Sequence, residues 1–212
     1  MPETRPADPH RIETEAQLRE VIPEPGRSID LKLFDHVDEY AAAFIARAPL
    51  LLLATADREG RLDVSPKGDA PGFVAVADPR TLLIPDRPGN RLAYGFRNLL
   101  ERPEVGMIFV VPGVTETLRV NGEAEITRDP ELLARLSARE KPALVVTRVR
   151  VRECFFHCGK AFIRSSLWKP QSWPKGVKAN IGRQIATRAK GGDTLAESIE
   201  QGLEKSYRTG LY

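Results

Sequence analysis

The stretch LLIPDRPGNRLAYGFRNLLERPEVGMIFVVPGVTETLRVNG, residues 82–122, decides the fold class. Its hydrophobic pattern changes twice along the chain. The apolar end of one strand is followed by residues at helical spacing, namely Leu92, Phe96, Leu99 and Leu100. Alternating segments come next, in which Leu118 and Val120 are separated by polar residues. One short helix between strands of this kind indicates a mainly β protein.

The sequence on either side of this stretch continues the same pattern. Further apolar or alternating runs predict strands at 50–56, 61–66, 72–77 and 143–153. Helices are predicted at 13–21, 35–49 (with Asp35 as N-cap), 129–138, 155–168 and 194–207. Six or seven strands in sequential hairpins, interrupted by single helices, predict a closed or nearly closed antiparallel barrel.

The composition is that of an ordinary globular protein. The chain has 212 residues, of which 42% are hydrophobic and 29% charged, enough for one well-buried core. No apolar run reaches the roughly 20 residues of a membrane span, and the first residues lack the apolar core of a signal peptide. Two cysteines supply no disulfide framework, so we expect a soluble cytoplasmic protein. A net charge of +3 permits an anionic ligand without indicating nucleic acid.

The loop inside the opening stretch is stiff and carries two arginines. Two prolines restrict the φ angle, Gly89 permits backbone angles closed to other residues, and the side chain of Asn90 can hydrogen-bond to its own backbone. We expect Arg91 to fall at the start of the following helix, where unpaired N–H groups favour a phosphate. Arg87 and Arg91 are therefore candidate anion ligands; the alternative is an ordinary solvated loop.

A second candidate anion site is the segment VSPKGDAPGF, residues 64–73. Ser65 and Lys67 lie at the predicted end of a strand beside glycines, where a hydroxyl, an ammonium and backbone N–H groups can converge on an oxyanion. An exposed lysine in an ordinary turn is the alternative.

A third candidate is the strand TETLRVNG, residues 115–122. Because Leu118 and Val120 form its apolar side, Thr117, Arg119 and Asn121 share the other face. That face could hydrogen-bond a heterocycle, or it could be a solvated outer face of the sheet.

The segment around Cys154, His157 and Cys158 also allows more than one interpretation. Three such residues could bind a metal, but structural zinc needs four ligands, so buried thiols without a metal are the preferred interpretation. Upstream, the RVRVR sequence places Arg148, Arg150 and Arg152 on one strand face. We expect a solvated or salt-bridged face there rather than a nucleic-acid contact.

Three segments, 64–73, 82–122 and 155–168, together resemble the pyridoxamine 5′-phosphate oxidase-like flavin-binding split-barrel proteins, and more narrowly their uncharacterised predicted flavin-nucleotide-binding subgroup. The resemblance covers about residues 30–170. It implies a six-stranded antiparallel split barrel, a homodimer and one FMN in each of two clefts between subunits. The FMN ligands that it implies are Ser65, Lys67, Arg87, Asn90 and Arg91 for the phosphate and ribityl chain, Thr117 and Arg119 near the isoalloxazine, and Lys160 and Arg164 at the border of the flavin.

The same resemblance implies an FMN-dependent oxidoreductase of unknown substrate, with NAD(P)H or a small molecule as the other reactant. It differs from true pyridoxamine 5′-phosphate oxidases because no Arg-x-His motif occurs near the C-terminus, where the chain reads SYRTGLY. A non-catalytic flavin carrier or redox sensor, and a related barrel that binds haem or deazaflavin, remain alternatives. The expected organisation is an N-terminal arm (1–29), the split barrel (30–170) and a helical extension packed on the barrel (171–212).

Overall fold

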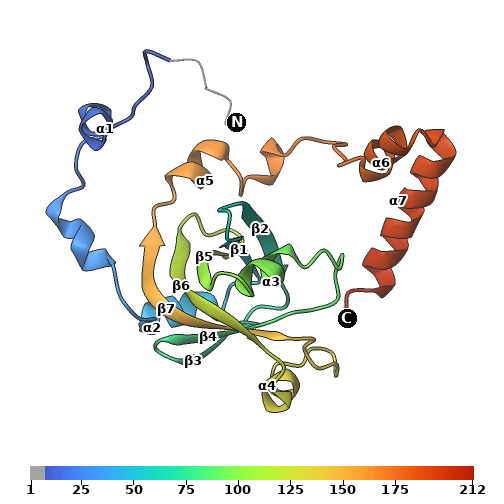
Figure 1. Cartoon of the computed structure of the whole chain (residues 1–212), viewed down its shortest axis with the longest axis horizontal. Helices are drawn as coiled ribbons and strands as arrows, with labels where there is room; N and C mark the ends of the chain where they lie inside the picture. The colour runs from blue at the N-terminus through green and yellow to red at the C-terminus, as the bar shows by residue number, and fades with distance from the viewer. Residues whose placement is uncertain (1–7) are drawn as a thin grey trace. The chain divides into compact units, whose positions relative to one another are not determined.

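The computed structural model describes residues 8–212, and these residues divide into two compact units with a boundary after Leu33 (Figure 1). The described part of the first unit contains helix α1 (Glu15–Val21) and the 3-10 helix η1 (Arg27–Lys32). Thr14 caps α1 through a capping box: its side chain accepts from the Gln17 N–H, and the Gln17 side-chain oxygen accepts from the Thr14 N–H. The helix predicted at 13–21 is therefore confirmed.

The second unit is built around one antiparallel sheet of seven strands. They are β1 (Leu50–Ala56), β2 (Leu62–Gly68), β3 (Ala75–Asp78), β4 (Thr81–Pro85), β5 (Glu104–Val110), β6 (Thr117–Thr127) and β7 (Val146–His157). Their order in the sheet is β2-β1-β5-β6-β7-β4-β3. The mainly β, antiparallel prediction is confirmed. Seven strands agree with the six or seven that the alternation predicts, whereas the six-stranded barrel implied by the family resemblance is wrong in its strand count. The sheet is also not closed, because its strand order ends at β2 on one side and at β3 on the other.

Four of the strand pairs join strands that follow one another in the sequence: the hairpins β1–β2, β3–β4 and β5–β6, and the pair β6–β7, which helix α4 connects. Two further pairs, β1–β5 and β4–β7, join strands that are distant in the chain. The register of β6 against β7 shifts between Asn121 and Gly122, at the bulge that a glycine in mid-strand indicates.

One face of the curved sheet holds the hydrophobic core. Alternate residues of the central strands are almost fully buried there, among them Leu51, Leu53, Met107, Phe109, Leu118, Val120, Val149 and Val151. Helix α2 (Glu39–Ile45) adds Ala41 and Ile45 to this core. Its N-cap is Asp38, whose side chain accepts from Ala41 N–H, and not Asp35 as predicted.

Two short helices connect strands of the sheet. Helix α3 (Tyr94–Leu99) joins β4 to β5 and buries Leu99, whereas Leu100, expected on the same apolar face, is exposed. Helix α4 (Pro130–Arg135) joins β6 to β7 and has Asp129 as its N-cap, as predicted.

The helix predicted at 155–168 is wrong in its first part. Strand β7 continues through Phe155 and Phe156 to His157, because β6 offers a hydrogen-bonding partner as far as Thr117. Only Lys160–Ser165 are helical, as α5. Trp168 follows it, with its indole N–H donating to the carbonyl of Val114 at 2.7 Å.

Beyond α5, the 3-10 helix η2 (Pro170–Ser172) leads to helices α6 (Ile181–Ala189) and α7 (Gly192–Thr209). The tail helix predicted at 194–207 is confirmed as α7, while α6 has no counterpart among the predictions. The two helices pack against each other: a Cβ on Gly182 would lie 2.5 Å from the Ala196 carbonyl oxygen, and Gly182 N–H donates to Glu200. That close approach requires glycine.

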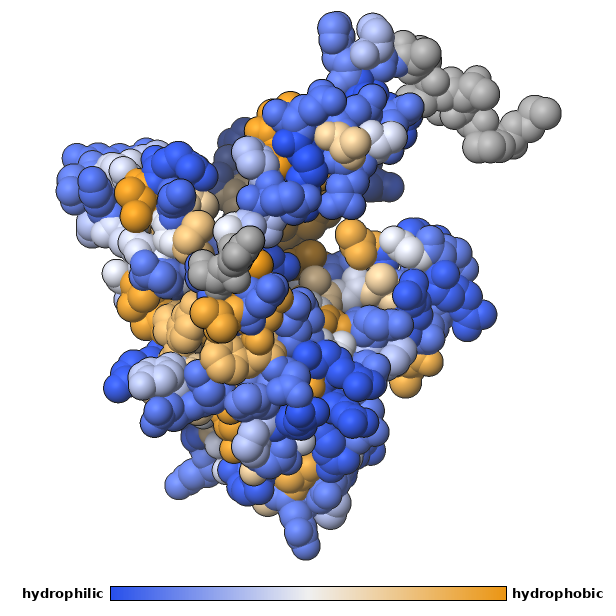
Figure 2. Space-filling view, turned by 90° about the vertical axis from the view of Figure 1, so that its left-hand side faces the viewer, coloured by the Kyte–Doolittle hydropathy of each residue, from blue (hydrophilic) through white to orange (hydrophobic). Residues whose placement is uncertain are grey.

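Apolar side chains also reach the surface in patches between charged ones, as the face in Figure 2 illustrates. Within residues 8–212, no helix combines the length and the apolar character that crossing a membrane would take.

Candidate functional site

The inward side of edge strand β2 carries a row of polar residues. Asp63, Ser65 and Lys67 alternate with the exposed Leu62, Val64 and Pro66, in strict period two. Their partners across the strand pair are the buried Thr55, Leu53 and Leu51. The row therefore faces the interior side of the sheet and spans about 13 Å along the strand.

Helix α3 lies over this row. A Cβ on Gly95 would be 3.5 Å from an Asp63 carboxylate oxygen and 3.8 Å from Ser65 Oγ. Asn98 Nδ2 donates to Thr55 Oγ1 at 3.0 Å, and the Lys67 ammonium lies 4.7 Å from the centre of the Phe96 ring. The contact with Phe96 has the geometry of a cation–π interaction.

The two motifs with candidate anion ligands come together at the end of this row. Lys67 Nζ donates to Asp86 Oδ1 at 2.8 Å, and Arg87 Nε donates to Asp69 Oδ2 at 2.7 Å. Each ion pair joins the end of β2 to the loop after β4: Lys67 lies near the end of the strand and Asp69 directly follows it. Both side chains of the cations are largely buried, at 20% exposure for Lys67 and 14% for Arg87.

Asp69 is the most buried member of this cluster, with 4% of its side chain exposed. Its Oδ2 accepts from Arg87, while its Oδ1 accepts from the Ala70 backbone N–H and from the Tyr212 hydroxyl at 2.6 Å. Burial by itself raises the pKa of Asp69, but the hydrogen bonds from Tyr212 and Arg87 outweigh it and hold this pKa below its ordinary value. The carboxylate is therefore ionised at neutral pH.

The rest of the loop differs from the prediction in one respect. Asn90 bonds its own backbone as expected, because its side-chain oxygen accepts from Leu92 N–H at 3.0 Å. Arg91, however, does not begin a helix: α3 starts at Tyr94, and Arg91 is an exposed residue with φ +62°. The argument that a helix N-terminus assists Arg91 is therefore wrong, although its guanidinium stays exposed on the loop.

Thr117 and Arg119 lie on the other face of the sheet. Pairing places Ser65 opposite Leu53, Leu53 opposite Met107 and Met107 opposite Val120. Because directly paired residues share a face, Ser65 faces the same side as Val120. Arg119, the neighbour of Val120, faces the opposite side, where its guanidinium lies 5.2 Å from the Phe155 ring centre.

The third residue of that face, Asn121, donates to Glu153 Oε2 at 2.7 Å. Thr117 itself is buried. One copy of the chain thus does not bring Thr117 and Arg119 to the same side as Ser65 and Lys67.

Lys160 and Arg164 lie one helical turn apart on α5, as predicted, and both are exposed. Helix α5 follows directly on the end of β7, which pairs with β6 at Thr117 and His157. These two cations are therefore attached to the end of the sheet where Thr117 lies.

Cys154 and His157 do not form part of a metal site. Cys154 is buried on the core side of β7, whereas His157 pairs with Thr117 on the opposite side. Burial raises the pKa of Cys154 to about 12, which keeps it a thiol. Cys158 is exposed, so the expectation of a buried thiol holds for Cys154 and is wrong for Cys158.

The RVRVR strand face is salt-bridged, as predicted. Arg148 pairs with Glu125 at 2.6 Å and Arg152 with Glu123 at 2.8 Å.

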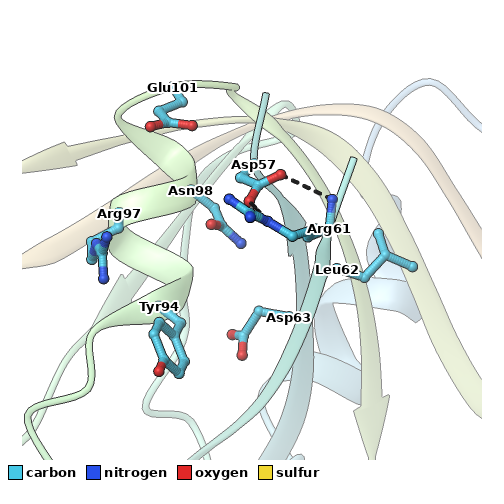
Figure 3. Close-up of a pocket in the computed structure, with 8 residues that line it drawn as sticks. All are labelled: Asp57, Arg61, Leu62, Asp63, Tyr94, Arg97, Asn98 and Glu101. Carbon is cyan, nitrogen blue, oxygen red and sulfur yellow. Dashed lines mark hydrogen bonds and ion pairs between the residues drawn. The ribbon is translucent and has the colours of Figure 1, made fainter. Parts of the chain in front are cut away.

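A polar pocket of about 280 Å³ lies at the other end of the β2 row, between α3 and the β1–β2 turn (Figure 3). Asp63 on β2 faces Tyr94 on α3 across it, and an ion pair between Asp57 and Arg61 closes one side at 2.6 Å. This volume is slightly below that of common small-molecule sites. The row on β2 thus connects a small pocket at Asp63 with the cationic loop at Lys67.

Three residues of the cluster are absent from the sequence predictions: Asp69, Asp86 and Tyr212. Asp86 stands directly before Arg87, and Asp69 stands two residues after Lys67. Acids so close in sequence to the candidate cations are a signal that could have indicated internal ion pairs. Tyr212 is 143 positions from Asp69, and no local pattern marks it.

The sequence model described as pyridoxamine 5′-phosphate oxidase matches residues 37–158, more than half of the chain. The chain belongs to the pyridoxamine 5′-phosphate oxidase family. Members of this family bind flavin. The matched range contains β1 to β7 with α3 and α4, and thus the whole cluster except Tyr212.

Several solved structures match part of the chain. HupZ of Group A Streptococcus has 18% identity over 57% of this chain and 93% of its own, with a TM-score of 0.47. A protein from Lactobacillus delbrueckii, described as a pyridoxamine 5′-phosphate oxidase, has 25% identity over 58% and 98%, with a TM-score of 0.46. An FMN-binding protein from Syntrophomonas wolfei has 14% identity over 57% and 85%, with a TM-score of 0.46. No curated protein sequence matches the chain.

Proposed function

We propose that this protein binds FMN, with the phosphate at the cluster of Lys67 and Arg87, and that it acts as an FMN-dependent oxidoreductase. The observation that carries the proposal is the meeting of two separate cationic motifs at the end of the β2 row, joined by the ion pairs Lys67–Asp86 and Arg87–Asp69. Membership of a flavin-binding family supports the choice of ligand.

The donors of this cluster fit a phosphate. Within residues 8–212, Arg87 Nη1 is buried without a hydrogen-bond partner, so the guanidinium keeps an unused donor after Nε binds Asp69. The Lys67 ammonium has three N–H donors and gives one of them to Asp86. Arg91 on the same loop is exposed and in none of the described ion pairs. Such charge-assisted donors are the ones that bind phosphate most strongly.

Each residue has a definite task in this proposal. Lys67 and Arg91 supply positive charge, the Ser65 hydroxyl supplies a neutral donor on the same side of β2, and Asn90 holds the loop through its bond to Leu92 N–H. Bound FMN would supply hydride-transfer chemistry. No side chain of the cluster is assigned as a general acid or base, because the carboxylates already accept bonds from Lys67 and Arg87.

We further propose that the site is completed by a second copy of the chain. Thr117 and Arg119 face the opposite side of the sheet from Ser65 and Lys67, so a flavin contacted by both sets needs two copies. The outward side of β2 offers an apolar surface for such an association, since Leu62 is 80% and Val64 59% exposed. The proposed assembly is a homodimer with FMN between its subunits.

The reactant besides FMN is proposed to be NAD(P)H or a small molecule, and pyridoxal phosphate synthesis is not proposed because the C-terminal Arg-x-His motif is absent. An absorption spectrum of the purified protein separates the cofactors: bands near 450 nm accompany a flavin, and a Soret band accompanies haem. Reduction of the bound flavin by NAD(P)H separates an oxidoreductase from a carrier.

Titration of apo-protein with FMN and with riboflavin, followed by flavin fluorescence, tests the phosphate site. Lys67→Met and Arg91→Ala should each weaken FMN binding about tenfold or more, because each removes a charge-assisted contact. Riboflavin, which has no phosphate, should bind wild type and variants alike. Arg183→Ala, at an exposed position of α6, is the control. FMN affinities within about threefold of wild type in both variants would place the phosphate elsewhere.

A further inference from the structure

Tyr212 lies far from β2 in the sequence but is bound to the cationic cluster. Its hydroxyl donates to Asp69 Oδ1 at 2.6 Å. Its backbone oxygen accepts from Lys141 Nζ at 2.6 Å, and its ring lies 4.8 Å from the Arg139 guanidinium. Three separate contacts thus hold this residue, which follows α7, against the segments after β2 and α4.

The hydrogen bond from Tyr212 acts on Arg87 through the shared carboxylate. Oδ2 of Asp69 accepts from Arg87, and its Oδ1 accepts from the Tyr212 hydroxyl and the Ala70 N–H. These three hydrogen bonds are 2.6–2.8 Å long. A carboxylate held on both sides cannot rotate without breaking one of these bonds. The orientation of Arg87 therefore depends on a residue that contributes nothing to the cationic charge.

We propose that Tyr212 is a positioning residue for Arg87: through Asp69, its hydroxyl fixes the guanidinium in the orientation that serves the phosphate. The expected effect of this positioning is that the protein prefers FMN over riboflavin, and this part of the proposal rests on the proposed FMN function. The other part, that Tyr212 fixes the orientation of Arg87, applies to the protein without flavin as well.

Tyr212→Phe removes only the hydroxyl and keeps the ring over Arg139. Tyr207→Phe is the matched control, because Tyr207 is an exposed tyrosine of α7. The first readout is the hydrogen-exchange rate of the Arg87 Nε–H, measured by ¹⁵N NMR on apo-protein and assigned with Arg87→Lys. The second is the pair of dissociation constants for FMN and riboflavin.

In wild type the Arg87 Nε–H should exchange slowly, because it is bonded to a buried carboxylate. Tyr212→Phe should speed this exchange about tenfold or more and weaken FMN binding by at least about threefold. Riboflavin binding should stay the same, and Tyr207→Phe should leave all three quantities unchanged. Lys141→Met, which loosens Tyr212 without touching Asp69, should move the first two quantities in the same direction, and it serves as the second variant should Tyr212→Phe fold poorly.

An unchanged exchange rate in Tyr212→Phe overturns the proposal, whatever the flavin results. Faster exchange with unaltered FMN affinity also overturns it, because the ordering of Arg87 then has no bearing on the phosphate, and leaves FMN binding itself intact. Faster exchange in a protein that binds neither FMN nor riboflavin supports the positioning of Arg87 and refutes the proposed function instead.

Discussion

At the scale of single residues, Asp69 links the pH to the stability of the cluster. Its pKa in the folded protein lies below the ordinary value of 3.8. A lowered carboxyl pKa contributes stability that is present above the ordinary value and is lost as the pH falls through the folded pKa. The free energy of unfolding of wild type should therefore decline below about pH 4, in part because Asp69 becomes protonated.

Asp69→Asn should abolish that part of the decline. The variant should be less stable than wild type at pH 7, since Arg87 loses its charged partner, and the difference should shrink by pH 3. Urea unfolding at the two pH values measures this, and Asp193→Asn, at an exposed position in the first turn of α7, is the control. A difference as large at pH 3 as at pH 7 contradicts the ionised, hydrogen-bonded state of Asp69.

The two thiols should react differently. Cys154 is 2% exposed and its pKa is raised to about 12 by burial, so little thiolate is available. Cys158 is exposed. A disulfide reagent at pH 8 should label one thiol rapidly in the native protein and the second only after unfolding, and Cys158→Ser should remove the rapid phase. Two rapid thiols would mean that β7 is open at Cys154.

At the scale of secondary-structure elements, the bulge in β6 depends on Gly122. A Cβ at this position would overlap the carbonyl oxygen of Arg150 on the neighbouring strand. Gly122→Ala should therefore reduce the free energy of unfolding by about 1–3 kcal/mol. In contrast, Gly202 lies in the interior of α7 with open space around its Cβ position, and Gly202→Ala should add about 0.5–1 kcal/mol. Thermal unfolding compares the two; equal effects would contradict the steric argument.

Most elements could be predicted from the sequence because their patterns are local. The helix predicted from residue 129 has Asp129 as its cap, and alternation places Arg119 on the face away from Val120. The segment at Phe155 and Phe156 could not be assigned in this way. Its aromatic residues also occur in helices, and the deciding factor is the hydrogen-bonding partner on β6, which no window around residue 155 contains.

The first residue of α3 also could not be predicted from the local sequence. The apolar spacing extends back to Leu92, yet Arg91 and Ala93 adopt left-handed φ angles and the helix begins only at Tyr94. The ion pairs of Lys67 and Arg87 with Asp86 and Asp69 connect this loop to β2. Such long-range contacts override the helical preference of the loop residues.

At the scale of the whole molecule, the proposed homodimer predicts a response to charge on the outward side of β2. Val64 is 59% exposed there, and burying an aspartate in an apolar interface is strongly unfavourable. Val64→Asp should shift the protein from dimer to monomer in light scattering and lower its flavin content together. Val177→Asp, at a position 73% exposed in the segment before α6, should change neither. A wild-type monomer with full flavin occupancy would refute the dimer.

Local residue patterns could predict the candidate cations, but only the family resemblance grouped Ser65 and Lys67 with Arg87, because no local pattern contains their meeting in space. Ser65 and Lys67 belong with Arg87 because β2 and the loop after β4 meet in space, and they are separated from Arg119 because the sheet lies between. The separation from Arg119 follows from the pairing of β1 with β5, whose paired residues are about 50 to 60 positions apart in the chain. The meeting of β2 with the loop rests on the ion pairs Lys67–Asp86 and Arg87–Asp69. The packing of the tail on the sheet domain as an extension stays a prediction. Ser172 and Trp173 bond to Ser166 and Leu167 at the start of the tail, and Tyr212 bonds to Asp69 and Lys141 at its end.

The two outermost strands also limit how copies of this protein can associate. In β2, Pro66 has no N–H to donate. Strand β3 has only four residues, Ala75–Asp78, of which three pair with β4, and its register shifts between Val76 and Asp78. A strand from another molecule would therefore find an interrupted row of hydrogen-bonding groups at either border. The protein should therefore resist the growth of continuous intermolecular sheets and fibrous aggregates, even at concentrations at which it forms the proposed homodimer.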